Sequence, residues 1–383
     1  MKIYIYIIFF NIVLSQSSSL ALYGLGEMNN TVDASGLSLG DSRLFSNNSF
    51  ILSAPSTYYK NKQASLAMTM TFNDLNTDYI NNLKSNNFNH VSFGFPITDN
   101  QYFMLSMNPN FRSNIVLNGD FEFIGADESN IDYDQDGEYD PMQYRNNYEL
   151  SGGISEISSS ISSKINDNIS LGFKIGQLFG TNNMENVSYF HVIDFDVDGN
   201  LVNQDANYPP VVYRTFNKYN YSSLTYKIDM RFNLRDKNTL AFYFGQSDHL
   251  DVSLDSFTKI VEQNGSVSLD HNYTKDYIFK GYMDYGIGFK SNIYENFGYV
   301  FEFQKYNAFH SLEDINVLNN SDLDMSSYHA GLFFRYDDIS LSGINAVNLN
   351  LGFYSRFFKA GHESVGDDLA FTFGIGLDYL NDN

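Results

Sequence analysis

The sequence has no cysteine and no tryptophan, and only 6 of its 383 residues are proline. Without cysteine there can be no disulfide scaffold, no thiol nucleophile and no thiolate metal site. Positive charge is scarce as well, since 23 lysines and arginines stand against 45 aspartates and glutamates, for a net charge of −22. Such a chain does not suit nucleic acid, whose phosphates need basic patches, or electrostatic docking on anionic lipid.

Long hydrophobic runs are missing after the N-terminus. The one apolar run, residues 3–14, follows Lys2. It has about the length of a signal-peptide core and is too short to span a membrane comfortably. We predict a signal peptide over residues 1–15 with cleavage after Ser15, and an N-terminal anchor is the alternative. No later stretch approaches the ~18 apolar residues of a helical span, so the exported protein is expected in the periplasm, outside the cell or in the outer membrane.

What the chain does contain, from residue 63 onward, is alternation of apolar residues with small or polar ones. In Leu369–Asp378, for example, leucine, phenylalanine and isoleucine alternate with alanine, threonine, glycine and aspartate. Period-2 alternation places the two sets on opposite faces of a strand. Segments of about ten residues with aromatic ends, after an export signal, favour an all-β antiparallel transmembrane β-barrel over a soluble β-sandwich or β-helix. Phe173, Phe301 and Phe371 should then face lipid.

Turn lengths alternate along the chain, as short periplasmic turns alternate with long extracellular loops in outer-membrane barrels. On this basis residues 63–383 form the barrel, and 250–274 is one of the long loops. Residues 16–62 do not alternate and are expected to form either a loose tail or a hatch folded into the barrel mouth. The twelve predicted strands are 64–73, 89–97, 101–124, 147–164, 169–193, 208–232, 238–248, 275–290, 297–306, 326–336, 345–357 and 368–380.

Several weak motifs stand in a specific order. They are Phe93-Gly94-Phe95-Pro96-Ile97, Asn108-Pro109-Asn110-Phe111-Arg112-Ser113, Gly152-Gly153-Ile154, the stretch from Ile165 to Thr181, and LAFTFGIGL at Leu369–Leu377. In this order the chain resembles FadL-type outer-membrane transport proteins, and most of all their divergent relatives in Bacteroidetes-like bacteria. The resemblance runs over the whole mature chain.

The resemblance implies a barrel of fourteen strands, an N-terminal hatch in its lumen and uptake of hydrophobic molecules such as long-chain fatty acids. Two features depart from the family. Ser53-Ala54-Pro55-Ser56 stands where the hatch usually carries an Asn-Pro-Ala signature, which puts inherited hatch contacts in doubt. Only twelve strands are visible before Asn383, so a C-terminally truncated sequence is expected, with a native twelve-stranded barrel as the alternative.

Pro109 lies between two strand-like halves. Because proline cannot donate to a strand ladder, it marks an edge, a bulge or a break. In the resembled family a kink in the third strand opens the barrel wall, and apolar substrate leaves sideways into the membrane. The alternative is that Pro109 simply ends a strand where a loop begins.

Two acidic stretches have the spacing of calcium loops, with alternate aspartates before a glycine. They hold Asp132, Asp134, Asp136 and Asp140 in the first case and Asp194, Asp196 and Asp198 in the second. Neither has the bidentate glutamate expected at the twelfth position, where Gln143 and Asp205 stand. Extracellular calcium is therefore one hypothesis. A hairpin turn at Asp198-Gly199 is the alternative for the second stretch, and loop adhesion to lipopolysaccharide through divalent cations is a further role. No cofactor is required.

Charged residues recur at positions predicted to face the lumen. Lys227, Asp229 and Arg231 share one strand face, and Lys174, Asp284, Glu302, Arg335 and Arg356 occupy inward positions elsewhere. Because buried charges pair, mutual salt bridges are the main interpretation. If a ligand carboxylate binds in the lumen, Arg335, Arg356 and Lys227 are the candidate residues, and arginine can pair with it bidentately.

The sequence holds no H-E-x-x-H, no G-x-S-x-G and no phosphate-binding glycine loop, so we do not expect an enzyme. We predict a passive transporter of hydrophobic compounds in the outer membrane of a Gram-negative-type envelope. A general porin or a structural, surface-binding barrel is the alternative. Expected partners are outer-membrane lipid, lipopolysaccharide, a hydrophobic small molecule and the barrel-assembly machinery, with no nucleic acid and a monomeric state.

Overall fold

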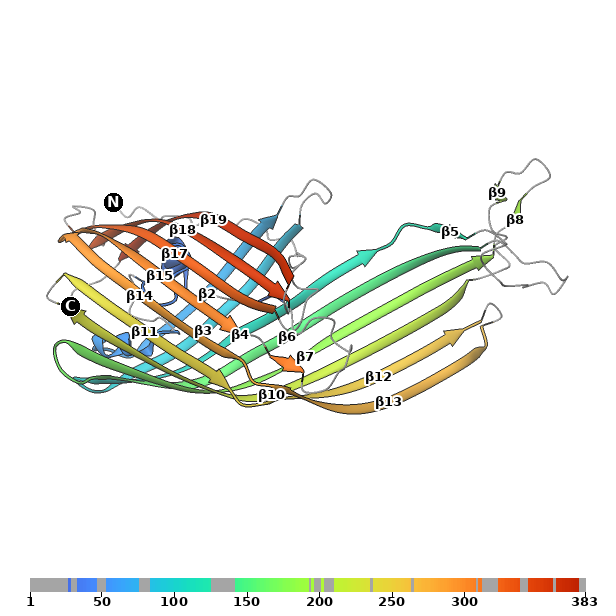
Figure 1. The fold of residues 1–383 in the computed structure, drawn as a ribbon, viewed down its shortest axis with the longest axis horizontal. Coiled ribbons are helices and arrows are strands. Elements are labelled where there is room, and N and C mark those ends of the chain that lie inside the picture. Colours follow the sequence, from blue (N-terminus) through green and yellow to red (C-terminus); the bar gives the residue numbers. More distant parts are fainter. Residues whose placement is uncertain are drawn as a thin grey trace, which may run out of the picture.

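The computed structural model describes residues 27–28, 33–46, 53–75, 83–124, 142–192, 194–195, 201–202, 210–234, 237–262, 265–307, 309–311, 323–337, 344–360 and 363–378. Nearly all of them belong to one large antiparallel sheet that curves into a barrel (Figure 1). Two short helices, α1 (Ala34–Ser38) and the 3-10 helix η2 (Pro55–Lys60), precede the main strands. No helix in these ranges is long and apolar enough to cross a membrane.

The strands follow in chain order. They are β1 (Glu27–Met28), β2 (Ser65–Leu75), β3 (Leu83–Thr98), β4 (Gln101–Asn118), β5 (Glu122–Ile124), β6 (Met142–Lys164), β7 (Ile169–Val192), β8 (Asp194–Phe195), β9 (Leu201–Val202), β10 (Val211–Leu234), β11 (Asn238–Ser247), β12 (Leu250–Val261), β13 (Val267–Lys280), β14 (Met283–Tyr294), β15 (Phe297–Asn307), β16 (His310–Ser311), β17 (Leu323–Tyr336), β18 (Ala346–Ala360) and β19 (Glu363–Asp378).

The barrel wall runs from strand to strand in an up-and-down order. Its twelve strands are β2, β3, β4, β6, β7, β10, β11, β14, β15, β17, β18 and β19, each antiparallel to the next. This confirms the number of wall strands that the alternation predicts. Among the described residues no register pairs join β19 to β2, so the sheet stays open between these two edge strands.

The two faces of the wall have the chemistry that the alternation predicts. Phe173, Phe301 and Phe371 lie on the outer surface and are 46%, 55% and 82% exposed, respectively. Asp229 and Glu302, at inward positions, are buried. An apolar outer belt around a polar interior is the pattern of a membrane barrel, and it would be unstable in water because of the hydrophobic effect. The predicted fold class is therefore confirmed.

One predicted loop is wrong. Residues 250–274 form most of a hairpin, β12–β13. β12 pairs with Val212–Ser222, the N-terminal half of β10. The single strand predicted over 275–290 is divided between β13 and β14, with a break at Gly281 and Tyr282. The alternation was hidden because the outward positions of β12 carry charges such as Asp251, which is typical of a strand in water.

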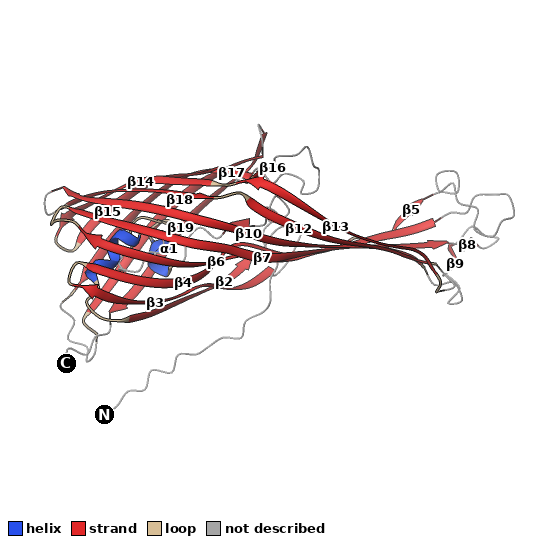
Figure 2. Ribbon diagram, turned by 90° about the horizontal axis from the view of Figure 1, so that it is seen from below, coloured by secondary structure: helices blue, strands red, loops and turns tan. Residues whose placement is uncertain are grey.

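The β11–β12 and β13–β14 junctions lie side by side. Ser247 donates its N–H to the carbonyl of Tyr282 (3.1 Å), and Tyr282 donates its N–H to the Ser247 hydroxyl (3.0 Å). Beyond these breaks β6, β7, β10, β12 and β13 continue past the rest of the wall and form a flat extension (Figures 1 and 2). β11 with β12, and β13 with β14, therefore each form one long strand with a break. Of these, only β11 and β14 belong to the lipid-facing wall.

Candidate functional site

Residues 33–46 and 53–62, which we call the lumenal segment, lie inside the barrel with α1 and η2 (Figure 2). Asp33 caps α1 by accepting the N–H of Gly36. Leu39, Leu44 and Phe45 of the segment are almost completely buried. They pack with Ala54 against inward side chains of the wall, namely Ala241, Tyr243, Val300 and Phe333. The segment is therefore held by an apolar core of its own inside a barrel with a largely polar interior.

The tightest contact of the segment with the wall is made by glycine. Gly40 has a left-handed φ of 77°, and a Cβ there would come within 2.4 Å of the Phe353 carbonyl oxygen. A Cβ on Gly352 would lie 2.0 Å from the Gly40 nitrogen. The Gly40 N–H donates to the Thr372 hydroxyl (3.0 Å), and its carbonyl oxygen lies 2.6 Å from His329 Nδ1. Glycine at both positions lets the two backbones approach each other.

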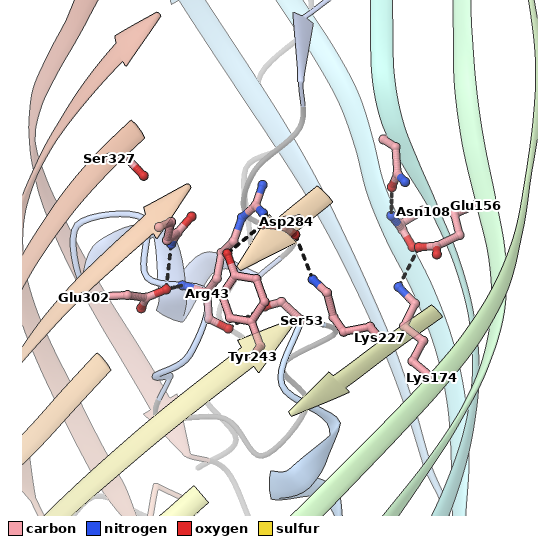
Figure 3. Close-up of polar contacts among 12 residues, drawn as sticks. Arg43, Ser53, Asn108, Glu156, Lys174, Lys227, Tyr243, Asp284, Glu302 and Ser327 are labelled. Atoms are coloured by element: carbon pink, nitrogen blue, oxygen red, sulfur yellow. Dashed lines mark hydrogen bonds and ion pairs between the residues drawn. The ribbon is translucent and has the colours of Figure 1, made fainter. Parts of the chain in front are cut away.

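Two carboxylates of the wall hold the next turn of the segment. Glu302 accepts the Ser42 hydroxyl (2.6 Å) and the N–H groups of Arg43 and Leu44 (3.1 Å each). Asp284 accepts the Arg43 guanidinium at 3.2 Å (Figure 3). Burial by itself would lower the pKa of Arg43, but the Asp284 carboxylate, with smaller contributions from Tyr243 and Asp41, raises it above its ordinary value. Arg43 therefore stays charged inside the lumen.

Asp284 and a further carboxylate, Glu156, also join strands of the wall to one another. Asp284 accepts the Lys227 ammonium (3.1 Å) and the Tyr243 hydroxyl (2.9 Å). Lys174 pairs with Glu156 at 2.5 Å on the neighbouring strands β7 and β6 (Figure 3). A buried charge without a partner is costly, so the charged residues of this belt stabilise the arrangement only as a set.

The lower part of the segment is held in the same way by β10. Asp229 accepts the N–H of Ser56 through both carboxylate oxygens, at 3.1 and 3.0 Å. Arg231 donates to the carbonyl oxygen of Leu44 and lies 5.2 Å from the ring centroid of Phe45. The residues around Ser53-Ala54-Pro55-Ser56 are therefore anchored to the wall even though the family signature is absent there.

The three cations predicted to meet a ligand carboxylate are all paired within the protein. Lys227 pairs with Asp284, and Arg356 pairs with Asp41 of the lumenal segment and with Asp368. Arg335 is exposed at the end of the barrel with the short turns, where it pairs with Asp337 (2.5 Å) and Asp378 (2.7 Å). Their role in ligand binding stays a prediction.

An apolar cluster fills the upper lumen, where the wall passes into the extension. We call it the apolar lumen cluster. Its members are buried and come from seven wall strands, β12, β13 and the residue before β16. They are Phe111, Ile154, Leu178, Tyr219, Tyr221, Leu250, Val252, Leu254, Tyr277, Phe279, Tyr306, Phe309, Met325 and Phe358. The sequence analysis missed the cluster because it took part of these residues as a loop, although Leu250, Val252 and Leu254 alternate.

The wall divides next to Pro109. The described ladder between β3 and β4 ends at the pair Val91–Met107. Above it β3 stays with β2, while β4 continues along β6 to Asn118, with a register shift between Pro109 and Phe111. The two-residue strand β1 pairs with β4 just above this point. Pro109 therefore lies inside a continuous strand at a bulge and does not end a strand.

The acidic stretches lie mostly outside the described residues. This holds for Asp132, Asp134, Asp136, Asp140, Asp196 and Asp198. Asp194 belongs to β8, which pairs with β9 through Asp194–Val202 and Phe195–Leu201, and this pairing fits the hairpin alternative. Within the described ranges no three acidic or histidine side chains gather as a metal site would require. Calcium binding stays a prediction.

No protein-family model and no curated protein matches the chain. Among solved structures it is similar to a FadL homologue of Pseudomonas aeruginosa, with 11% identity, a TM-score of 0.40 and coverage of 87% of this chain and 91% of the other. The FadL-type family is the one that the sequence motifs resemble.

The Pseudomonas putida toluene transporter TodX shares 9% identity with the chain, at a TM-score of 0.42, with 88% and 89% of the two chains covered. The monoaromatic hydrocarbon channel CymD shares 12% identity, at a TM-score of 0.37, with 91% and 94% covered. Such distant likenesses say nothing about what this chain binds, so its function has to be argued from its own geometry.

Proposed function

We propose that the protein is a passive outer-membrane channel for hydrophobic compounds, with the lumenal segment as its hatch. The observation that carries this proposal is the apolar lumen cluster. The lumen of a hydrophilic porin is lined with polar side chains, whereas here Leu178, Val252 and Leu254 point inward and are buried. Moving apolar surface out of water is favourable by roughly 25 cal/mol per Å², so such a lining favours an apolar solute over ions.

The hatch supports the same function. The contacts of Ser42, Arg43 and Gly40 with the wall close the lumen below the apolar lumen cluster. A solute that enters from the side of the extension therefore meets apolar side chains first and the polar belt next. These contacts of the described residues favour a closed lumen over the open polar channel of a general porin.

The divided wall next to Pro109 supports lateral release. Above the pair Val91–Met107 the two strands separate, and β1, which precedes the lumenal segment in the chain, pairs with β4 there. An apolar solute gains little from an aqueous exit and more from a path into acyl chains. In this proposal movement of the hatch and of β1 opens that path.

The apolar outer surface of the wall bears on what surrounds the barrel. Exposed phenylalanine, leucine and isoleucine side chains cover the wall strands, and acyl chains of the outer membrane are their natural contact. We extend the proposal to lipopolysaccharide around the outer half, to insertion by the barrel-assembly machinery and to a monomeric state. The ligand roles of Arg356, Lys227 and Arg335 belong to the same proposal.

The test is binding of apolar ligands to the purified full chain in a non-ionic detergent. Mass spectrometry of copurifying molecules is followed by titration with toluene and with a long-chain fatty acid. Leu254→Asn puts a polar group into the apolar lumen cluster. Because burial of a leucine side chain is worth ~1.5–3 kcal/mol, we expect affinity for both ligands to fall roughly tenfold or more.

The matched control is Leu269→Asn, on the same hairpin but 41% exposed, which should leave affinity unchanged. Steady ion conductance of the wild type in planar bilayers, with no bound apolar molecule, would favour the porin and contradict the proposal. Equal affinities of Leu254→Asn and the wild type would remove the role of the apolar lumen cluster.

A further inference from the structure

A cavity lies at the end of the barrel with the short turns, below the lumenal segment, and its chemistry differs from that of the apolar lumen cluster. Its volume is about 290 Å³, and its lining includes Lys60, Arg231, Lys290, Arg335, Glu295 and Phe333. Four of these six residues are cations and one is a carboxylate, in a chain with a net charge of −22. The salt bridges that hold the hatch do not account for this local excess of positive charge.

The cations differ in how far they are neutralised. Arg335 has two carboxylate partners, Asp337 and Asp378. Neither Lys60 nor Lys290 has an ion pair or a hydrogen bond within the described part of the chain. The ammonium of Lys290 lies 4.3 Å from the ring centroid of Phe333, a contact that positions the charge but does not neutralise it.

Arg231 adds a third positive charge at the cavity. Its side chain is 6% exposed, and one guanidinium nitrogen donates to the hatch. Its Nε is buried and has no hydrogen-bond partner among the described residues. Because Nε is inaccessible, Arg231 acts on the cavity through its positive charge.

Lys60 shows that the cavity is poorly neutralised. Desolvation inside the barrel and, next, the nearby Arg231 charge lower the pKa of Lys60 to about 8. Lys60 belongs to η2 in the lumenal segment, and Lys290 to the wall strand β14. An anion between them would bridge the hatch and the wall.

From these groups we propose that the cavity binds the anionic head of a small amphiphile. The head is a carboxylate or a phosphate, because the oxygens of both accept from ammonium and guanidinium groups. Lys60 and Lys290 supply ammonium donors, Arg231 adds a third positive charge, and Phe333 contacts the first apolar carbons. The proposal does not depend on the apolar lumen cluster, since the two sites lie on opposite sides of the hatch.

The test is calorimetric titration of the full chain in a non-ionic detergent. Four probes are compared: octanoate, octyl phosphate, octanol as an uncharged molecule of the same chain length, and inorganic phosphate. We expect the better of the two charged amphiphiles to bind at least roughly tenfold tighter than octanol, since a charge-assisted hydrogen bond contributes about that factor. Tighter octanoate binding supports a carboxylate head, such as that of a transported acid, and tighter octyl phosphate binding supports a lipid head group.

The variants are Lys60→Met, Lys290→Met and the double substitution. The double variant should bind both charged amphiphiles no better than octanol. The matched control is Lys237→Met, an exposed lysine in a short turn at the same end of the barrel, which should leave all affinities unchanged. Migration of unheated protein on a denaturing gel reports folding. If the double variant does not fold, the Lys60→Met variant alone tests the proposal, because it leaves the wall strands unchanged.

Three outcomes would overturn the proposal. The first is equal affinity for octanol and both charged amphiphiles. The second is a Lys60→Met variant that binds as the wild type does. In the third, inorganic phosphate binds as tightly as octyl phosphate, which leaves an anion site with no role for Phe333. None of these results bears on toluene binding or on the Leu254→Asn variant, so failure here is distinguishable from failure of the proposed channel function.

Discussion

Replacing Asp284 by alanine should loosen the hatch and destabilise the protein more than replacing the arginine that Asp284 holds. Arg43 and Asp284 have side chains that are each 7% exposed, and Lys227 pairs with the same carboxylate. Without Asp284 two buried cations lose their carboxylate. Breaking a buried ion pair in this way costs about 3–5 kcal/mol.

Arg43→Met removes one partner of Asp284 and leaves the other two in place. Asp284 then keeps the Lys227 ammonium at 3.1 Å and the Tyr243 hydroxyl at 2.9 Å. The loss is close to that of one charged hydrogen bond, about 1.5–3 kcal/mol. The structure therefore predicts an order of destabilisation, with Asp284→Ala above Arg43→Met.

Urea unfolding of the purified protein in detergent measures that order, and single-channel recording measures the loosened hatch as bursts of ion conductance. Asp251→Ala, an exposed carboxylate on β12, is the control and should lie within about 0.5 kcal/mol of the wild type. An Arg43→Met loss as large as that of Asp284→Ala would refute the reasoning, as would an Asp284→Ala variant that stays closed and as stable as the wild type.

Three further changes test other parts of the structure. Burial raises the pKa of Asp33 from its ordinary 3.8 to about 6. The contribution of the protonated Asp33 carboxyl to the free energy of unfolding is therefore complete below pH 3.8 and is lost as pH rises through 6. The free energy of urea unfolding should therefore show Asp33→Asn gaining about 2.4 kcal/mol over the wild type between pH 4 and pH 7, and parallel pH profiles would contradict this. Gly352→Val should displace Gly40 and produce conductance, whereas Gly366→Ala, with no atom within 4 Å of the added Cβ, should not; a silent Gly352→Val would exclude the close backbone contact. Deleting Asn110 should remove the bulge in β4 and slow release of apolar ligand into vesicles, while deleting Ile293 at the β14–β15 bulge should not, and equal rates would argue against lateral release.

Part of the candidate site was predictable from sequence. Lys227, Asp229, Asp284 and Glu302 were placed at inward positions, and the structure has them there, with the three carboxylates buried and Lys227 partly buried. Their partners in the lumenal segment were not predictable, because Ser42 lies 260 residues from Glu302 in the chain and Arg43 lies 241 from Asp284. No local pattern encodes contacts of that range.

What the sequence determined by itself is the orientation of side chains on each strand. Alternation is local, since each residue points away from its neighbours' face, and it sufficed for the twelve wall strands and the outer apolar belt. Tertiary structure decided where the chain passes from lipid to water, which turned the predicted loop at 250–274 into the β12–β13 hairpin. It alone brought Lys60, Arg231 and Lys290 to one cavity, because only the curvature of the wall around the lumenal segment brings η2, β10 and β14 together.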